Sequence, residues 1–384
     1  MKPVPVRDLP VGSYIDSPVY LDQNFILLAP EIPIAESLIR RLAIWEFNKV
    51  YTEGGVLSAP PSEAGATVQS GGALSADLKE EESRKETFVI FKKKVGELAT
   101  IFERFKTRDE LRIAEITDLV KELIDLVKNR PRHALSLPDV ETPDQGFLVS
   151  HAVKTSILGL AIADFLKLPP HRVIEVGIAG LLHTIGMLRI PSDIYLSDRP
   201  LNEKEKQMIV AQPILGFRSL KAAGFAMPIC LAVLEHHERI DGSGYPRNVT
   251  GEKLSMYGKI IAVASSYVAA VSQRPFREAR DGHSGIMDLL RDMGKLYDEK
   301  VLRALVFTLS IYPIGTYVEL ASGSRGIVIR TNPETPKMPI VKLLTNPKGE
   351  PYLERPVVQS EDAGDLQVSR PLTAEESKAL REIS

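Results

Sequence analysis

The chain has 384 residues, of which 44% are hydrophobic and 26% charged, so it is a globular chain too long for one ordinary core. With 48 Lys and Arg residues against 50 Asp and Glu residues, the formal net charge is −2, and we expect no binding to DNA or RNA. A single cysteine, Cys230, excludes an internal disulfide and a Cys-x-x-Cys zinc site, and it suits a reducing compartment.

Apolar runs in the chain are too short to span a membrane. The longest lies around Ile260 to Val271 and is interrupted by Ser265 and Ser266, whereas a spanning helix needs roughly 20 apolar residues. The N-terminal stretch MKPVPVRDLPVG lacks the apolar core of a signal peptide. We therefore expect no membrane span and a cytoplasmic protein.

Residues 1–53 predict a small α+β module. Short β-rich runs at Tyr14–Ile15, Val19–Tyr20 and Phe25–Leu28 are separated by turn residues, and KVYTEG predicts a closing strand. Between them, apolar residues recur at helical spacing at Ile34, Leu38, Leu42 and Trp45. A core of this size fits a docking or sensing module better than an enzyme.

The next segment, residues 54–85, predicts a flexible linker, since its first part is rich in Ala, Gly, Ser and Pro. A helical domain is predicted over 86–311. It begins with two amphipathic helices, whose apolar positions run from Phe88 to Phe105 and from Ile113 to Val127. Packing within a bundle is the favoured interpretation of these helices, and a seam that forms a homodimer is the alternative.

From Phe147 to Leu309, Ala- and Leu-rich segments alternate with proline-marked breaks, as in a compact all-α domain. Residues 312–362 are β-rich, with a hairpin about the Ser322–Gly323 turn and a second one in MPIVKLLTNPKGEPYLE. The tail, 363–384, is charged and is expected to be peripheral. The fold class is therefore mainly α: a helical bundle with an α+β N-terminal module and a C-terminal β-hairpin extension.

Histidines mark the candidate site. His151, His183 and the adjacent pair His236–His237 have the side chain that is the commonest neutral metal ligand, and several helices of a bundle can aim such groups at one point. The alternative is half-buried histidines bonded to neighbours, which is the favoured interpretation of His151 or His183 taken alone. The run HHERIDGSGYP favours a site, because its Asp241–Gly244 turn fixes Tyr245 and Pro246 in a loop beside the paired histidines.

Five segments carry a resemblance to a known family, over roughly His151 to Ala279: SHAVKTSILGLA, LLHTIGM, LNEKEKQMIVAQPILG, HHERIDGSGYP and KIIAVASSYVAAVSQRPFREA. In order and spacing they are similar to the HD-GYP family, bacterial HD-superfamily phosphodiesterases that hydrolyse cyclic di-GMP at a metal centre. The resemblance implies an HD-superfamily helical bundle.

The family's metal ligands are only partly present. His151 matches its leading histidine, His183 the histidine of the His–Asp pair, and His236 and His237 its double histidine. Thr184 stands where the family has the bridging aspartate, Gln212 where it has a histidine, and Ser265 where it has a second aspartate. Met187 stands where the family has a lysine after the signature. Phe147 stands where some members have a glutamate that binds a third metal.

Loss of both aspartates predicts loss of a paired metal centre. Two dications 3.5 to 4 Å apart repel by about 17 to 19 kcal/mol at an effective dielectric constant of 20, and carboxylates normally offset that repulsion. Without them a paired site requires Glu175, Glu238 or Asp241 to move in. A single Fe, Mn or Zn ion held by His151, His183, His236 and His237 is the remaining metal site, with no bridging hydroxide for hydrolysis.

The recognition loop is retained, comprising Asp241, Gly242, Gly244, Tyr245 and Pro246. By the resemblance, Arg274 and Arg277 match phosphate contacts, Tyr245 a substrate or partner contact, and the loop a docking site for GGDEF-domain proteins. The alternatives are a solvated helix end for the two arginines and packing of Tyr245 on the helices. We therefore expect no catalytic residues and a signal-transduction pseudoenzyme that binds cyclic di-GMP, a partner, or both. The alternatives are a metal-dependent phosphodiesterase with residual activity and a purely architectural adaptor.

Overall fold

The computed structural model describes residues 2–17, 19–20, 26–28, 34–36, 39–40, 42, 49–57, 70–137, 146–197, 199–272, 280–332 and 334–381. These residues divide into two compact units, Met1–Lys79 and Glu80–Ser384. Each unit has its own core, and they are considered separately.

The first unit is built on short antiparallel strands. A sheet of order β1-β5-β3-β4 contains β1 (Lys2–Pro5), β5 (Lys49–Thr52), β3 (Val19–Tyr20) and β4 (Ile26–Leu28), and β2 (Tyr14–Ile15) pairs with β6 (Val56–Leu57). The short helix η1 spans Val6–Asp8. The predicted strands are therefore present. Of the predicted helix, Ile34 and Leu42 are buried in the core of this unit, whereas Leu38 and Trp45 lie outside the described residues.

The segment predicted as a linker, 54–85, contains more structure than its composition indicated. Val56–Leu57 forms β6, and helix α2 (Ser70–Arg108) begins inside the segment. The second half of the segment reads ADLKEEESRK, which consists mostly of residues with high helix propensity, and this accounts for the early start of α2.

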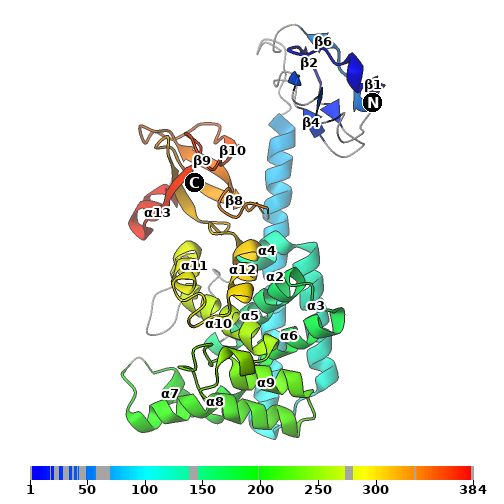
Figure 1. Cartoon of the computed structure of the whole chain (residues 1–384). Helices are drawn as coiled ribbons and strands as arrows, with labels where there is room; N and C mark the ends of the chain where they lie inside the picture. The colour runs from blue at the N-terminus through cyan, green and yellow to red at the C-terminus, as the bar shows by residue number, and fades with distance from the viewer. Residues whose placement is uncertain are drawn as a thin grey trace. The chain divides into compact units, whose positions relative to one another are not determined.

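The second unit is a bundle of helices followed by a sheet (Figure 1). After α2 the bundle has α3 (Ile113–Asn129), α4 (Pro131–Ser136), α5 (Phe147–Phe165), α6 (Pro170–Leu182), η4 (Ile185–Arg189), α7 (Ser192–Tyr195), α8 (Glu203–Ala222), α9 (Met227–Glu235), η5 (Gly251–Lys253), α10 (Met256–Val271), α11 (Gly282–Arg291) and α12 (Glu299–Leu309). The mainly helical fold class is confirmed.

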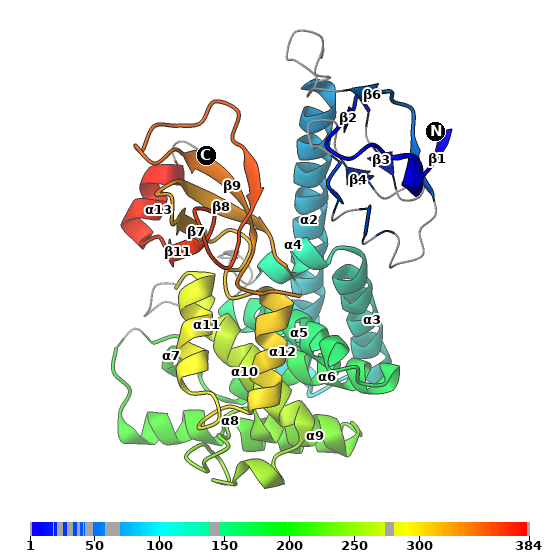
Figure 2. The same cartoon turned by 45° about the horizontal axis from the view of Figure 1, so that its top comes forward.

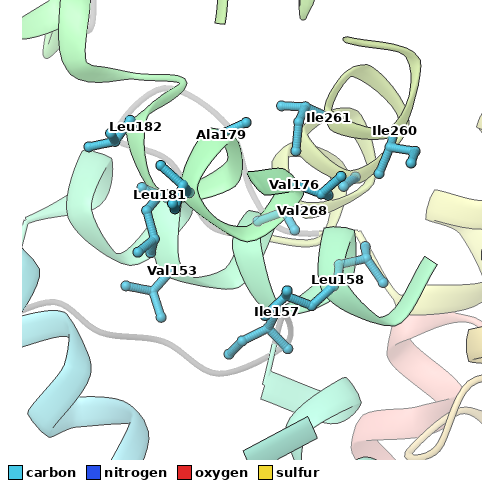
Figure 3. Packing of buried hydrophobic residues seen from close by; sticks show 14 of the residues in the cluster. Val153, Ile157, Leu158, Val176, Ala179, Leu181, Leu182, Ile260, Ile261 and Val268 are labelled. Atoms are coloured by element: carbon cyan, nitrogen blue, oxygen red, sulfur yellow. The ribbon is translucent and has the colours of Figure 1, made fainter. Parts of the chain in front are cut away.

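Helix α5 is the central element of this bundle. It packs against α3, α6, α10 and α12, and its side chains meet those of α6 and α10 in one core (Figure 3). A Cβ at Gly180 of α6 would lie 2.6 Å from the Cα of Ser156, so α5 and α6 approach closely because this position is glycine. Helix α5 is long and apolar enough to cross a membrane, but 83% of that window is buried within the protein. Among the described residues it is the one helix that is long and apolar enough, and α10, which contains Ile260–Val271, is a shorter apolar helix.

The apolar faces of α2 and α3 pack into the same core. Phe91, Leu98 and Phe105 of α2 and Ile116 and Leu123 of α3 are buried. These positions are covered within one chain, which supports packing in a bundle over a dimer seam built from the same residues.

A five-stranded antiparallel sheet follows the helices (Figure 2). Its order is β10-β9-β8-β7-β11, with β7 (Tyr317–Leu320), β8 (Arg325–Arg330), β9 (Ile340–Thr345), β10 (Val357–Gln359) and β11 (Val368–Pro371). The β7–β8 hairpin turns at Ser322–Gly323 as predicted, and Gly323 has a φ of +86°.

The prediction of a peripheral tail at 363–384 is wrong for much of its length. Strand β11 pairs with β7, and Leu380 of helix α13 (Ala374–Arg381) is buried against Tyr317 and Leu344. The charged residues obscured this role in the sequence, because β11 is a short edge strand with few apolar side chains.

Candidate functional site

Two of the candidate histidines occupy equivalent places at helix ends. His183 follows the last residue of α6 and His236 follows the last residue of α9. In each, Nδ1 lies 2.7 Å from a carbonyl oxygen of the preceding turn, that of Gly180 or of Val233. Those carbonyls have no partner in the helix, so each ring donates its Nδ1–H there and keeps its lone pair at Nε2.

The four imidazoles lie side by side in a row that we call the histidine row: His151, His183, His236 and His237. Successive ring centroids are 5.2, 5.1 and 4.1 Å apart. An aromatic ring stacks on each end. Phe147 lies 5.6 Å from His151, and Tyr245 lies 4.7 Å from His237, with interplanar angles of 24° and 20°. The structure thus brings all four predicted histidines together.

The interior of the row is uncharged. His183 is 1% exposed, and burial lowers its pKa to about 4. The pKa of His236 lies well below its ordinary value. Burial is the largest cause, and the neighbouring His237 and His183 lower it further. Both rings are therefore neutral at pH 7, and neither repels nor offsets a cation by charge.

Among the positions that differ from the family pattern, Gln212 contacts the histidine row directly. Gln212 donates its amide N–H to the carbonyl oxygen of His183 at 2.6 Å, and Ser265 donates to that of Ala262 at 3.4 Å. Gln212, Thr184 and Ser265 are buried, whereas Met187 is half-buried. His183 Nε2, Thr184 Oγ1 and Gln212 Oε1 are buried without a hydrogen-bond partner among the described atoms. Each of these three atoms can accept a hydrogen bond, and the Thr184 hydroxyl can also donate one.

The residues do not fit the metal centre that the family resemblance implies. Across the described ranges, which omit 138–145 and 273–279, no group of three or more His, Cys, Asp or Glu side chains is arranged to hold a metal ion. The single-ion site at His151, His183, His236 and His237 stays a prediction.

The three carboxylates considered as replacement metal ligands, those of Glu175, Glu238 and Asp241, are engaged elsewhere. Glu175 accepts a hydrogen bond from the Tyr257 hydroxyl at 2.6 Å. Glu238 accepts hydrogen bonds from the backbone N–H groups of Arg247 and Val249, which follow the recognition loop. Asp241 is exposed and accepts a hydrogen bond from the Ser243 N–H. Among the described residues, these three carboxylates are therefore engaged by other groups and do not offset the repulsion of a pair of dications.

The recognition loop, Asp241–Pro246, is held in one conformation by its own sequence. Asp241 Oδ1 accepts from the N–H and the hydroxyl of Ser243 at 2.9 and 2.7 Å, and these bonds lower the pKa of the carboxyl. Gly242 has a φ of +82°, and a Cβ at Gly244 would overlap the backbone of Glu238 and Arg239. Both glycines are required by the path of the backbone.

Tyr245 connects the loop to the histidine row. Its N–H donates to the His237 carbonyl oxygen at 3.2 Å, and its ring stacks on that imidazole. Burial raises the pKa of the Tyr245 phenol to about 12, so its hydroxyl is a donor at neutral pH. The other predicted ligand contacts, Arg274 and Arg277, lie outside the described residues.

Two buried acids, Glu235 and Glu238, flank the paired histidines; sequence reasoning missed Glu235 and considered Glu238 only as a replacement metal ligand. Both are at most 3% exposed, and both accept hydrogen bonds from segments beyond the loop. The signal was present in the run EHHE, since charged residues within an otherwise apolar helix end must find partners when buried.

Comparison with known proteins finds similarity to HD-domain proteins. Residues 122–301 match the family model of the HD domain. The chain is 28% identical over 378 residues to a cyclic di-GMP phosphodiesterase of Pseudomonas aeruginosa, an alignment that covers 95% of this chain and 90% of that protein.

A cyclic di-GMP phosphodiesterase of Borreliella burgdorferi is 30% identical over 213 residues, which cover 55% of this chain and 56% of that protein. Among solved structures, an HDG"Y"P protein from Bdellovibrio bacteriovorus has a TM-score of 0.49 at 15% identity, over 79% of this chain and 97% of that one. In agreement with the resemblance seen in the sequence, residues 122–301 match the HD domain, and the loop Asp241–Pro246 contains the GYP part of the HD-GYP pattern.

Proposed function

We propose that this chain is a catalytically inactive HD-GYP-like protein of bacterial cyclic di-GMP signalling, which acts in the cytoplasm by binding the nucleotide, a GGDEF-domain partner, or both. One observation carries the proposal. His183 and His236 are neutral, and the described acids considered as replacement ligands hold other groups, whereas the recognition loop keeps its full sequence and its hydrogen bonds.

Loss of hydrolysis follows from the charge of the pocket. A paired metal centre needs carboxylates to offset the repulsion between its ions, and Thr184, Gln212 and Ser265 provide none. Family phosphodiesterases depend on metal for their nucleophile. A pocket that cannot hold the pair therefore has no group to attack phosphorus.

Binding can persist without metal. A phosphodiester can be held by arginine, and Arg274 and Arg277 are the residues of this chain that match the family's phosphate contacts. Tyr245 offers a neutral hydroxyl and an aromatic ring next to the row. These groups can bind the nucleotide but cannot cleave its phosphodiester bond.

Incubation of the purified chain with cyclic di-GMP and Mn²⁺ or Fe²⁺ tests catalysis. We expect no pGpG or GMP. Turnover that His236→Ala abolishes would establish the alternative, a phosphodiesterase with a rearranged metal site.

Titration calorimetry with cyclic di-GMP tests binding. We expect heat of binding with the unmodified chain and a weaker interaction with Arg274→Ala. Absence of heat at high micromolar nucleotide, together with binding of a GGDEF domain that Tyr245→Ala removes, would leave partner docking as the function. Absence of both would indicate an architectural adaptor.

A further inference from the structure

Glu235 is a buried acid that the proposed function does not use. It is the last residue of α9, directly before His236, and its side chain is 2% exposed. A carboxylate removed from water costs several kcal/mol unless charges and hydrogen bonds compensate it. Its partners therefore reveal what it holds in place.

Those partners come from two other segments. Glu235 Oε1 lies 2.5 Å from an Arg247 guanidinium nitrogen, and Oε2 accepts from the Ser255 N–H at 2.9 Å and the Ser255 hydroxyl at 2.6 Å. Arg247 directly follows the recognition loop, and Ser255 is the N-cap of α10. One carboxylate thus joins the end of α9, the end of the loop and the start of α10.

The start of α10 is a favourable place for this charge. A helix N-terminus carries a partial positive charge, and the Ser255 hydroxyl relays it by accepting from the Gly258 N–H at 3.0 Å. Glycine at 258 is also required, because a Cβ there would lie 2.6 Å from Glu235 Oε2. The contact is therefore built from several residues.

Glu238 secures the same stretch from the other side of the paired histidines. Its carboxylate accepts from the Arg247 N–H at 2.7 Å and the Val249 N–H at 3.3 Å. Arg247 is consequently held at its backbone by Glu238 and at its side chain by Glu235. Tyr245 lies two residues earlier, so its ring is held where it stacks on His237.

We infer that Glu235 is a positioning residue: through Arg247 and Ser255 it locks the recognition loop onto α10 and fixes the stack of Tyr245 on His237. The inference concerns the free protein, and only its ligand readout depends on the proposed function. Within the described part of the chain, α10 ends at Val271, shortly before Arg274 and Arg277. A lock at its start therefore connects the loop with the helix that leads to the expected phosphate contacts.

Histidine-selective ¹³C labelling tests this in the absence of ligand. The chain has 7 histidines, and the His237 signal is assigned by its loss in His237→Gln. Tyr245→Leu gives the position of that signal without the stacked ring. At pH 8 we expect Arg247→Met and Glu235→Gln to move the His237 signal toward the Tyr245→Leu position, and Arg247→Lys to restore much of the original position.

Glu299→Gln is the matched control, because it breaks a surface pair with Arg303 whose side chains are 54% and 67% exposed. We expect it to leave the His237 signal unmoved. If Arg247→Met and Glu235→Gln lower the melting temperature while His237 stays at its original position, the residue is merely structural and the inference is overturned. Should Glu235→Gln fail to fold, Arg247→Met decides alone, since Arg247 is partly exposed.

A second readout extends the test to the ligand. Arg247→Met should weaken cyclic di-GMP binding by about tenfold, which corresponds to about 1.4 kcal/mol. If the unmodified chain binds no nucleotide, the proposed binding of cyclic di-GMP is wrong. The His237 signals then still test whether Glu235 positions the loop. Equal affinity of Arg247→Met and the unmodified chain, with His237 unmoved, would contradict it.

Discussion

The histidine row and the recognition loop lie in the same helical unit but differ in how their polar groups are hydrogen-bonded. In the pocket, His183 Nε2, Thr184 Oγ1 and Gln212 Oε1 are buried without hydrogen-bond partners among the described atoms. In and around the loop, the carboxylates of Glu235, Glu238 and Asp241 each accept at least two hydrogen bonds.

This difference shows where the chain departs from its family pattern and where it keeps it. Under the proposed function, neutral side chains at Thr184, Gln212 and Ser265 are tolerated because no pair of ions is bound there, whereas the loop requires its acids to hold its own backbone. The contrast predicts that changes restoring charge to the pocket alter metal binding, and that changes to the loop alter its conformation.

The largest effect is expected from restoring the family's ligands with Thr184→Asp, Gln212→His and Ser265→Asp together. Without metal, two added buried carboxylates should lower the free energy of unfolding by about 3 to 5 kcal/mol. With Mn²⁺ the triple variant should recover that stability and bind two ions per chain. Urea unfolding with chelator and with Mn²⁺, and elemental analysis, measure both.

The conservative variant Thr184→Asn provides the control, since it fills a similar volume without charge. It should bind no metal. A triple variant that is unaffected by Mn²⁺ would indicate that the helices, and not only the side chains, prevent the family's metal centre.

A large effect on the loop is expected from Gly244→Ala. The added Cβ would overlap backbone atoms of Glu238 and Arg239, so the loop must shift, at a cost of about 3 kcal/mol. Gly96→Ala is its control, because nothing lies within 4 Å of a Cβ there and α2 is helical at that point. That substitution should stabilise the chain by about 0.5 to 1 kcal/mol. Equal melting temperatures for the two variants would contradict the account of the loop.

Acid should destabilise the chain through the pocket. The pKa of His183 is lowered from 6.5 to about 4 in the folded protein. Below pH 6.5 this histidine therefore binds a proton in the unfolded chain but stays unprotonated in the folded chain. The free energy of unfolding falls as the pH drops from 6.5 to 4, by about 3 kcal/mol for this group. Urea unfolding at pH 7 and pH 5 measures the loss, which His183→Gln should reduce. An equal loss in both proteins would contradict the assignment to His183.

The smallest effect is expected at the junction of the loop with α10. Ser255→Ala removes an N-cap and one donor to Glu235, and it should cost about 1 kcal/mol in the free energy of unfolding. Ser255→Thr keeps the hydroxyl and should retain most of that stability in thermal unfolding. A Thr variant as unstable as the Ala variant would argue against a role for the hydroxyl.

Periodicity and turn residues predicted much of the fold. The spacing of Phe91, Val95 and Leu98 placed one face of α2 in the core, and the Ser322–Gly323 turn placed the β7–β8 hairpin. Strand β11 could not be predicted in the same way, since its partner β7 is almost 50 residues away along the chain. A pairing of that kind depends on the tertiary fold.

The site was predicted in its residues but not in its geometry. The sequence indicated the four histidines and the three neutral replacements, and the structure brings the histidines together and places Gln212 against His183. That the rings form a row depends on the relative directions of the ends of α6 and α9, which spacing along the chain does not give. The roles of Glu235 and Glu238 likewise require knowledge of which backbone N–H groups lie against them.

Elemental analysis of the unmodified chain, purified without chelators and then equilibrated with Mn²⁺ or Fe²⁺, tests the central claim most directly. A neutral pocket predicts that no pair of ions is retained after gel filtration. Two ions per chain, lost together on His183→Ala, would contradict that claim and restore the chain to the active members of its family.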